Sequence, residues 1–327
     1  MPNPTPLSPD RRPTREGVLA AAAKIAKILP PTPLLPLEVE DATIWCKAEC
    51  LQPIGAFKVR GAWHRLTDLS DEQRRRCVVA FSSGNHAQGV AWAARRLGVA
   101  ATIVMPRDAP VKKVANTQAL GAEVVLYDRY RESREDIAAR LAGARGAVVV
   151  PSFDDPWVIE GQGSVAVEVA AQLRDLTGRE PAGWVVCCGG GGLSGGIALA
   201  SPGTPITLVE PEGWDDVGAS LSAGRPVPVG PNPPPTMCDA VQTLVTGERP
   251  LAVLMDAGAK AVSVSEAEVA DAMRCAFDRL RLVVEPGGAV ALAAVLAGKV
   301  EVRDGLCITL SGGNVDAEVF ARVLLGD

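Results

Sequence analysis

The sequence CCGGGGLSGG occupies residues 187–196 and lies at the end of the apolar run WVVCC, which begins at residue 184. This order predicts a buried strand, a turn of four consecutive glycines and a helix that begins near Leu193. Such a turn presents backbone N–H groups at a helix N-terminus, where a phosphate dianion is well stabilised. A turn that needed only a positive φ would require one or two glycines. The four glycines therefore predict a phosphate-binding loop.

The same glycines allow a second interpretation. Gly190, Gly192 and Gly195 match the pattern G-x-G-x-x-G of dinucleotide-binding proteins. The next apolar run, ITLV at 206, is followed by Glu210, about 20 residues beyond the glycines, where an acid that binds ribose would lie. The motif alone does not decide between a nicotinamide-dependent dehydrogenase and an enzyme with another phosphate-containing cofactor.

Outward from this loop, short β-branched runs alternate with Ala-rich amphipathic segments, as in parallel strands joined by helices. Four strands between residues 77 and 150 form one compact group, and the later strands form a larger one. Strands are expected at TIWCK (43), CVVAFS (77), ATIVM (101), EVVLY (123), AVVV (147), WVVCC (184), ITLV (206), AVSV (261) and CITL (307). Helices are expected over residues 16–29, 85–97, 110–120, 131–143, 158–175, 265–281 and 287–298.

Length and composition agree with an α/β protein of two domains. The chain has 327 residues, and domains usually take about 150. Hydrophobic residues make up 47% and charged residues 22%, which argues against extended disorder. The formal net charge of −5, without long runs of either sign, argues against a nucleic-acid partner.

No segment is interpreted as a signal peptide or a membrane span. The start, MPNPTPLSPDRRPTR, is rich in proline and lacks an apolar core, so we expect a loose arm and a cytoplasmic protein. Residues 181–209 carry no charge and exceed the roughly 20 residues that a bilayer needs. They contain eight glycines and three prolines, however, which suits strands and a turn.

The cysteines are expected to be buried and reduced. They are scattered without a C-x-x-C pair, and only two histidines accompany them, so a thiolate metal site is not predicted. The cysteines are Cys46, Cys50, Cys77, Cys187, Cys188, Cys238, Cys275 and Cys307, and the histidines are His64 and His86.

A second loop, FSSGNHAQGVAWAARRLG at 81–98, follows a predicted strand and opens a helix. A plain N-cap needs one hydroxyl, whereas this loop offers Ser82 and Ser83 together with Asn85 and His86. We therefore expect a cradle for a carboxylate or another anion.

Two further segments add candidate groups. In QPIGAFKVRGAWHRL at 52–66, Lys58 follows an aromatic residue and stands between two glycines, where its pKa could be lowered for service as an amine nucleophile. An ordinary surface lysine is the alternative. In CITLSGGNVD at 307–316, a strand ends at Ser311, as many strand-to-helix loops do.

Together and in this order, the four segments resemble those of the fold type II pyridoxal-phosphate enzymes, in particular the group of threonine dehydratases and serine racemases. The resemblance extends from Pro33 to Asp316 and includes EDATIWCKAECLQ before the lysine, PSFDDPWVIEGQGS at 151–164 and VVEPGGAVALAA at 283–294. It implies two open, twisted, mostly parallel sheets flanked by helices, as in the tryptophan synthase β fold. It also implies a large cofactor-binding domain of residues 1–67 and 150–327, and a small domain of residues 68–149 that carries the SSGNH loop.

The resemblance assigns roles to the candidate residues. Lys58 would carry the cofactor covalently, Phe57 would pack on its ring, Asn85 would contact its phenolic oxygen and Ser311 would face the pyridine nitrogen. Glu285 would lie near the ring, although a helix cap is a comparable role. The phosphate would be held by Gly189, Gly190, Gly191, Gly192 and Leu193. The substrate carboxylate would be held by Ser82, Ser83, Asn85 and His86.

The implied reaction is β-elimination from a hydroxy amino acid such as L-threonine or L-serine, in which the released Lys58 amine takes the α-proton. Ser83 resembles the second acid or base of racemases, so a serine or aspartate racemase, or a 3-hydroxyaspartate dehydratase, is the alternative. Arg134 resembles an arginine that reaches a substrate side-chain carboxylate, although a solvated helix face explains it equally. Thr243 is a candidate for contact with the β-hydroxyl. A dehydrogenase or a non-catalytic amino-acid sensor is a more distant alternative.

Two further expectations follow from the same resemblance. VEPEGWDD at 209–216 is similar to a divalent-cation site, with Glu210, the carbonyl of Trp214 and Asp216 as hard ligands for Mg²⁺ or Ca²⁺. Ile54-Gly55-Ala56 replaces the Thr-Gly-Ser usual before the lysine, which removes two hydroxyls near the cofactor. The expected partners are a small-molecule substrate and a second copy in a homodimer, with no membrane.

Overall fold

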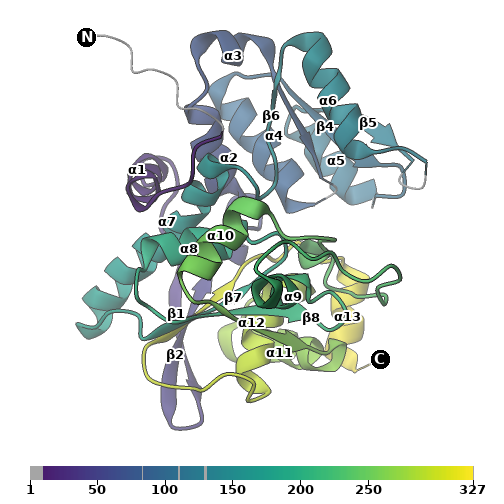
Figure 1. Cartoon of the computed structure of the whole chain (residues 1–327). Helices are drawn as coiled ribbons and strands as arrows, with labels where there is room; N and C mark the ends of the chain where they lie inside the picture. The colour runs from purple at the N-terminus through teal and green to yellow at the C-terminus, as the bar shows by residue number, and fades with distance from the viewer. Residues whose placement is uncertain (1–9, 83, 110, 129–130, 327) are drawn as a thin grey trace.

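The computed structural model describes residues 10–82, 84–109, 111–128 and 131–326. Two sheets with flanking helices form the chain (Figure 1). The strands are β1 (Leu34–Val39), β2 (Ala42–Ala48), β3 (Val78–Phe81), β4 (Ala101–Pro106), β5 (Glu123–Tyr127), β6 (Val148–Val149), β7 (Gly183–Cys187), β8 (Ile206–Pro211), β9 (Lys260–Val264) and β10 (Leu306–Leu310). The helices are α1 (Arg15–Ile25), α2 (Lys58–Thr67), α3 (Asp71–Arg76), α4 (Asn85–Leu97), α5 (Val111–Ala119), α6 (Arg134–Arg145), α7 (Pro156–Thr177), α8 (Gly192–Ala200), α9 (Asp216–Ala223), α10 (Glu248–Asp256), α11 (Glu266–Leu280), α12 (Pro286–Leu296) and α13 (Ala317–Leu325).

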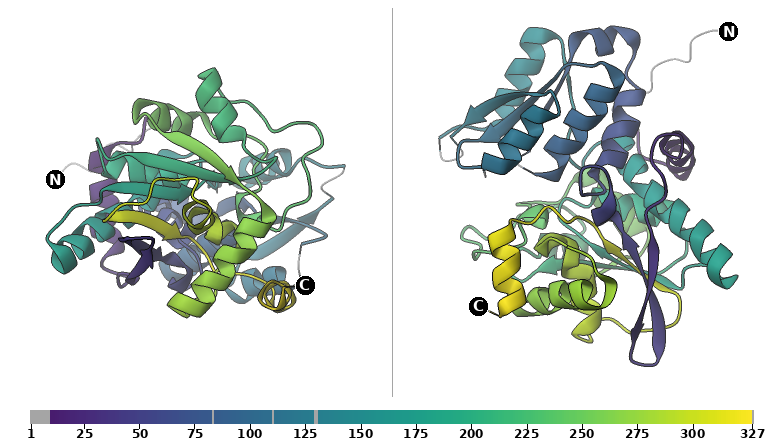
Figure 2. Two further views of the ribbon diagram at one scale, coloured as in Figure 1. Left: turned by 90° about the horizontal axis from the view of Figure 1, so that it is seen from below. Right: turned by 180° about the vertical axis from the view of Figure 1, so that it is seen from behind.

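The larger sheet has six strands in the order β1-β2-β10-β7-β8-β9. Its strands pair in parallel except for β1 and β2, which form an antiparallel hairpin at one edge. Every residue of β7 and of β10 is buried, as expected for central strands covered on both faces. Figure 2 shows the hairpin and α13 on opposite sides of this sheet.

The smaller sheet has the order β5-β4-β3-β6, is parallel throughout and lies at the top of Figure 1 with α3 to α6. The predicted mostly parallel α/β fold is therefore confirmed. The domain boundaries remain a prediction, because one apolar cluster joins Val78 and Ile103 of this sheet to Ile25 of α1 and Val59 of α2.

All nine expected strands are present, and β1 is the strand that the sequence did not predict. Pro33 precedes it and Pro36 lies within it, a composition that argues against a strand in a sequence. As an edge strand, β1 pairs only with β2, so a proline can be accommodated there.

The seven expected helices are also present, although α1 ends at Ile25, four residues before residue 29. Helix α2 was not predicted. Its apolar residues Val59, Ala62, Trp63 and Leu66 do follow the spacing of a helix face. The opposite face carries Arg60, His64 and Arg65, which are also buried in the fold. Helices α3, α9, α10 and α13 are short and were also not predicted.

Two expectations about composition can be compared with the structure. All eight cysteines are free thiols, and all are buried except Cys275, which is half-buried. Among the helices of the described residues, none combines the length and apolarity that a membrane span requires.

Candidate active site

Lys58 is the first residue of α2, and Figure 1 shows α2 between the smaller and the larger sheet. Its Nζ donates a hydrogen bond of 2.8 Å to the carbonyl of Ser152 and lies 5.2 Å from the centre of the Phe57 ring. Burial of the amine lowers the pKa of Lys58 to about 8. About a tenth of such an amine is unprotonated at pH 7, far more than of a lysine with an ordinary pKa, which suits a nucleophile.

The glycine loop connects β7 to α8. Gly191 has a φ of +87° and is the N-cap of α8. Within the part of the chain that the structure describes, none of the backbone N–H groups from Gly189 to Ser194 donates to another protein group. These donors are therefore available at the positive end of a helix, as a phosphate site requires.

The glycines also make room for neighbouring side chains. A Cβ on Gly190 would lie 2.2 Å from the Phe153 ring, and one on Gly189 would lie 2.8 Å from Oγ1 of Thr243. Only Gly191 of the four needs its positive φ. Close packing, which the sequence did not reveal, is thus a second reason for four glycines.

Asn85 lies at the start of α4 and is held from two sides. Its Nδ2 donates to Oε1 of Glu285 at 2.6 Å, and its Oδ1 accepts from Nδ2 of Asn314 at 2.7 Å. Asn314 also donates to the carbonyl of Ile54 at 2.8 Å. The loops after β3 and β10 therefore meet at Asn85, as expected where the carboxyl ends of parallel strands converge.

The sequence interpretation did not single out Asn314, although it lies in the quoted segment CITLSGGNVD. Glu285 occupies the N-cap position of α12, but its side chain makes no capping bond. Burial raises the pKa of Glu285 to about 7. Its contact with Asn85 thus favours the role near the cofactor ring over that of a helix cap.

Ser311 follows β10 and is buried, and its carbonyl accepts a hydrogen bond of 3.1 Å from the N–H of Phe57. Ser311 also hydrogen-bonds Cys187, the last residue of β7, which opposes the rise that burial causes in the pKa of that thiol. The ends of the neighbouring strands β7 and β10 thereby lie beside the segment that carries Lys58.

The SSGNH loop is described in part. Ser82 accepts a hydrogen bond from the N–H of Gly84, whereas Ser83 lies outside the described residues. Nε2 of His86 lies 2.9 Å from the carbonyl of Val150, and burial lowers the pKa of His86 to about 3. The ring is therefore neutral with its proton on Nε2, so Nδ1 is an acceptor. This tautomer does not offer a substrate carboxylate the donor that the sequence interpretation expected.

Arg134 and Thr243 lie at the margins of the site. Arg134 is exposed at the start of α6, pairs with Glu135 at 2.8 Å, and its guanidinium lies 5.5 Å from the Phe81 ring at the end of β3. Thr243 is partly buried beside Gly189 of the glycine loop. Both positions are adjacent to loops that the sequence assigned to the site.

The expected cation ligands follow β8. Glu210 accepts hydrogen bonds from the N–H groups of Val217 and Gly218, and Asp216 accepts one from Thr246. Burial raises the pKa of Glu210 to about 8 and that of Asp216 to about 7. Oδ1 of Asp216 is buried without a partner, so the donor set suits a cation. The described residues contain no group of three His, Cys, Asp or Glu side chains suited to a metal, and the expected site uses only two carboxylates and a carbonyl.

A network of buried ion pairs holds the first turn of α2, the turn that begins with Lys58. Arg60, two residues after Lys58 in the first turn of α2, donates to both carboxylate oxygens of Glu49 and to Glu168 of α7. Lys47 of β2 donates to Glu168 as well, at 2.8 Å. The first turn of α2 is thereby fixed to β2 and α7.

The comparisons agree with this geometry. The family model described as "Pyridoxal-phosphate dependent enzyme" matches residues 25–312. The L-threo-3-hydroxyaspartate ammonia-lyase of Saccharomyces cerevisiae is 41% identical over 323 residues, covering 96% of this chain and 97% of the relative. The structure of maize serine racemase superposes with a TM-score of 0.88 at 33% identity, covering 97% of this chain and 98% of that one. The structure of a T.th. threonine deaminase gives a TM-score of 0.85 at 42% identity, covering 93% of this chain and 99% of that one.

The residues present fit pyridoxal phosphate on observations independent of these likenesses. The uncommitted N–H groups of the glycine loop suit a phosphate dianion. The Lys58 amine, with its pKa lowered to about 8, suits the cofactor aldehyde.

Proposed function

The chain belongs to the family of pyridoxal-phosphate-dependent enzymes, and from this membership we propose that it eliminates water from a 3-hydroxy amino acid. Hydrolysis of the dehydrated amino acid then releases ammonia and leaves a 2-oxo acid, so that the water lost in the first step is consumed in the second. The observation that carries this proposal is the Lys58 amine, partly buried against a neutral carbonyl beside the glycine loop.

Bound pyridoxal phosphate supplies a π-system that delocalises the negative charge left on Cα when its proton departs. The N–H groups of Gly189 to Gly192 and of Leu193 would hold its phosphate. Asn85, oriented by Glu285 and Asn314, would contact the ring oxygen, while Phe57 would contact the ring face.

Lys58 has two tasks in this proposal. Its unprotonated amine would hold the cofactor, and the same Nζ, when free, would accept the α-proton of the substrate. The neutral Ser311 hydroxyl would face the pyridine nitrogen, and a neutral partner limits the lifetime of charge on Cα. Elimination of the β-hydroxyl is therefore favoured over transamination.

We propose L-threo-3-hydroxyaspartate as the preferred substrate, ahead of the L-threonine and L-serine that the sequence suggested first. Arg134 lies beside Phe81, directly before the serine loop, and would bind the second carboxylate. The 41% identity to a relative of that name supports the same choice. Thr243, beside the glycine loop, would contact the hydroxyl that leaves.

Racemisation is the second candidate. It would use Ser83 on the face of the substrate opposite Lys58, and the serine racemase of Schizosaccharomyces pombe, 37% identical over 321 residues, favours it. The chirality of recovered serine separates the candidates, since a racemase would yield D-serine without release of a 2-oxo acid.

The test is 2-oxo acid release by the purified holoenzyme with L-threo-3-hydroxyaspartate, L-threonine and L-serine. Lys58→Ala should abolish turnover and the visible absorption of the bound cofactor. Arg134→Ala should lower kcat/KM for hydroxyaspartate by about tenfold while sparing serine, since a charge-assisted contact is lost. Arg140→Ala, an exposed change on the same helix, serves as control. Holoenzyme that releases no 2-oxo acid from any of the three would refute the proposal.

Three expectations accompany this function. Glu210, Asp216 and the Trp214 carbonyl would bind Mg²⁺ or Ca²⁺ in a structural or activating role. We also propose that the enzyme is a cytoplasmic homodimer, which light scattering after size exclusion and fractionation of the source cells would test.

A further inference from the structure

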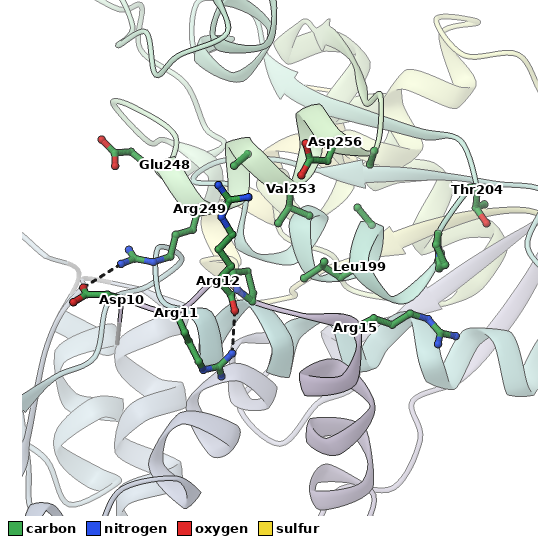
Figure 3. A pocket seen from close by; sticks show the side chains of 17 residues that line it. Asp10, Arg11, Arg12, Arg15, Leu199, Thr204, Glu248, Arg249, Val253 and Asp256 are labelled. Carbon is green, nitrogen blue, oxygen red and sulfur yellow. Dashed lines mark hydrogen bonds and ion pairs between the residues drawn. The ribbon is translucent and has the colours of Figure 1, made fainter. Parts of the chain in front are cut away.

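A cavity of about 610 Å³ lies between the N-terminal segment, the end of α8 and the length of α10 (Figure 3). Its volume is within the range of about 300–1,000 Å³ usual for small-molecule pockets. Ala198, Leu199, Ala252 and Val253 give it an apolar wall, and Arg12, Arg15 and Arg249 reach it from two sides.

Two of these arginines carry charge that the protein does not neutralise. Arg12 and Arg15 are exposed, and in the described part of the chain neither side chain forms a hydrogen bond or ion pair. Figure 3 shows Arg12 extending from the N-terminal segment toward α10, with Arg249 on one side and Val253 on the other. Figure 3 shows Arg15 directed away from Arg12, on the side of Thr204. An anion bound beside the apolar wall would therefore pair the charge of Arg12.

The acidic residues that line the cavity do not cancel its preference for an anion. Asp10 is directed at Arg249, and Glu248 and Asp256 are the first and last residues of α10, about 12 Å apart along the helix axis. In Figure 3 Glu248 extends away from Arg12. The middle of the cavity therefore combines an apolar wall with positive charge.

The cavity is separate from the site around Lys58, since none of its lining residues belongs to that site. The two are linked through Arg249, whose side chain donates to Asp154 at 3.3 Å. Asp154 lies two residues after Ser152, the carbonyl of which accepts from Lys58.

We propose that this cavity binds a small organic anion, a molecule with an acidic group for Arg12 and an apolar body for the wall formed by α8 and α10. The proposal does not depend on which reaction the enzyme catalyses. A pair of matched fluorescent probes tests it: 8-anilinonaphthalene-1-sulfonate, which has both features, and N-phenyl-1-naphthylamine, which lacks the sulfonate.

The experiment is a fluorescence titration of the holoenzyme with each probe. Saturable binding of the sulfonate at one site per chain is expected, about tenfold or more tighter than that of the neutral probe, because a charge-assisted contact is made. In the variant Arg12→Ala the advantage of the sulfonate should disappear while the neutral probe binds as before. Arg75→Ala, which removes an exposed arginine of α3, should change neither affinity.

Ala252→Trp would fill the cavity from α10 and should weaken both probes. An unchanged circular dichroism spectrum and unchanged visible absorption of the bound cofactor would show that each variant is folded. The proposal is overturned if Arg12→Ala binds the sulfonate like wild type, if the neutral probe binds as tightly as the sulfonate, or if folded Ala252→Trp retains both affinities.

Discussion

At the scale of single residues, Lys47 and Lys58 differ in the groups to which their amines donate hydrogen bonds. Burial lowers the pKa of both Lys47 and Lys58. The charge of Glu168 opposes this lowering of the pKa at Lys47, whereas among the described residues the acceptor of the Lys58 amine is the neutral carbonyl of Ser152. An amine without a carboxylate partner loses its proton more readily, which is why Lys58 is the lysine suited to chemistry.

The lowered pKa predicts the pH dependence of cofactor attachment. Only the unprotonated amine attacks an aldehyde, and its fraction grows as the pH rises toward the pKa of about 8. The rate at which apoenzyme takes up pyridoxal phosphate should therefore rise up to pH 8 and level off above it. Stopped-flow absorbance measures this rate. A rate that kept rising to the ordinary lysine pKa, about 10.4, would contradict the assignment.

Asn314 provides a second prediction at this scale. Asn314→Ala removes the donor to Oδ1 of Asn85, and a buried polar atom left unpaired costs about 1–3 kcal/mol. We expect cofactor affinity to fall by about tenfold, measured by titration of the apoenzyme. Asn116→Ala, at an exposed position of α5, should leave the affinity unchanged. If both variants bind the cofactor with equal affinity, Asn314 does not contribute to cofactor binding.

At the scale of elements, the glycine loop depends on what packs against it. Phe153 lies against Gly190 and Gly192, and the N–H of Gly247 donates to the carbonyl of Gly190 just before α10 begins. The position of the proposed phosphate site is thus set jointly by β7, α8, α10 and the turn before α7.

Gly190→Ala should impair cofactor binding for this reason. Its Cβ would lie 2.2 Å from the Phe153 ring, so the loop or the ring must move. The double variant Gly190→Ala/Phe153→Ala should regain affinity that the single variant loses, measured by equilibrium titration with pyridoxal phosphate. If the double variant binds no better than Gly190→Ala, crowding by Phe153 is not the cause.

The β8–α9 connection carries the metal prediction. Adding Mg²⁺ or Ca²⁺ to chelator-treated enzyme should raise its Tm, since a cation would pair the buried carboxylates of Glu210 and Asp216. Asp216→Asn should abolish the shift while keeping the acceptor for Thr246, and Asp215→Asn, at the exposed neighbour, should retain it. Scanning calorimetry distinguishes these results, and an unchanged Tm in the wild type would refute the site.

At the scale of the whole molecule, a buried ion network joins segments that are distant in sequence. Lys47, Glu49, Arg60 and Glu168 connect β2, α2 and α7. The two acids and two bases balance each other, so that removal of one member leaves a buried charge unpaired.

Arg60→Met should therefore destabilise the fold by about 3–5 kcal/mol, the usual cost of breaking a buried pair. Arg174→Met, which breaks the exposed pair with Glu180, should cost about 0–1 kcal/mol. Urea unfolding of both variants gives the comparison. Similar losses in the two would show that the network around Arg60 does not stabilise the protein as a buried one should.

Local pattern in the sequence predicted the fold class, nine strands and the loops after β3, β7 and β10, because apolar periodicity and glycine turns depend on nearby residues. It did not predict β1 or α2. Pro36 argued against an edge strand. The apolar spacing of Val59, Trp63 and Leu66 could have predicted α2, but not that Arg60 on its polar face is buried, because that burial depends on Glu49 and Glu168 from other elements. The family and cofactor inferred from four motifs are confirmed by the matching family model, whereas the individual roles of the site residues remain predictions.

The sequence by itself therefore determined the elements and the chemical groups that the chain carries. The tertiary structure alone decided which groups meet: Asn85 with Asn314 and Glu285, Lys58 with Ser152, and the arginines of the N-terminal segment with α10. These contacts join residues far apart in the chain. The physical reason is that periodicity reports which face of an element is buried, while the identity of its partner depends on how whole layers pack.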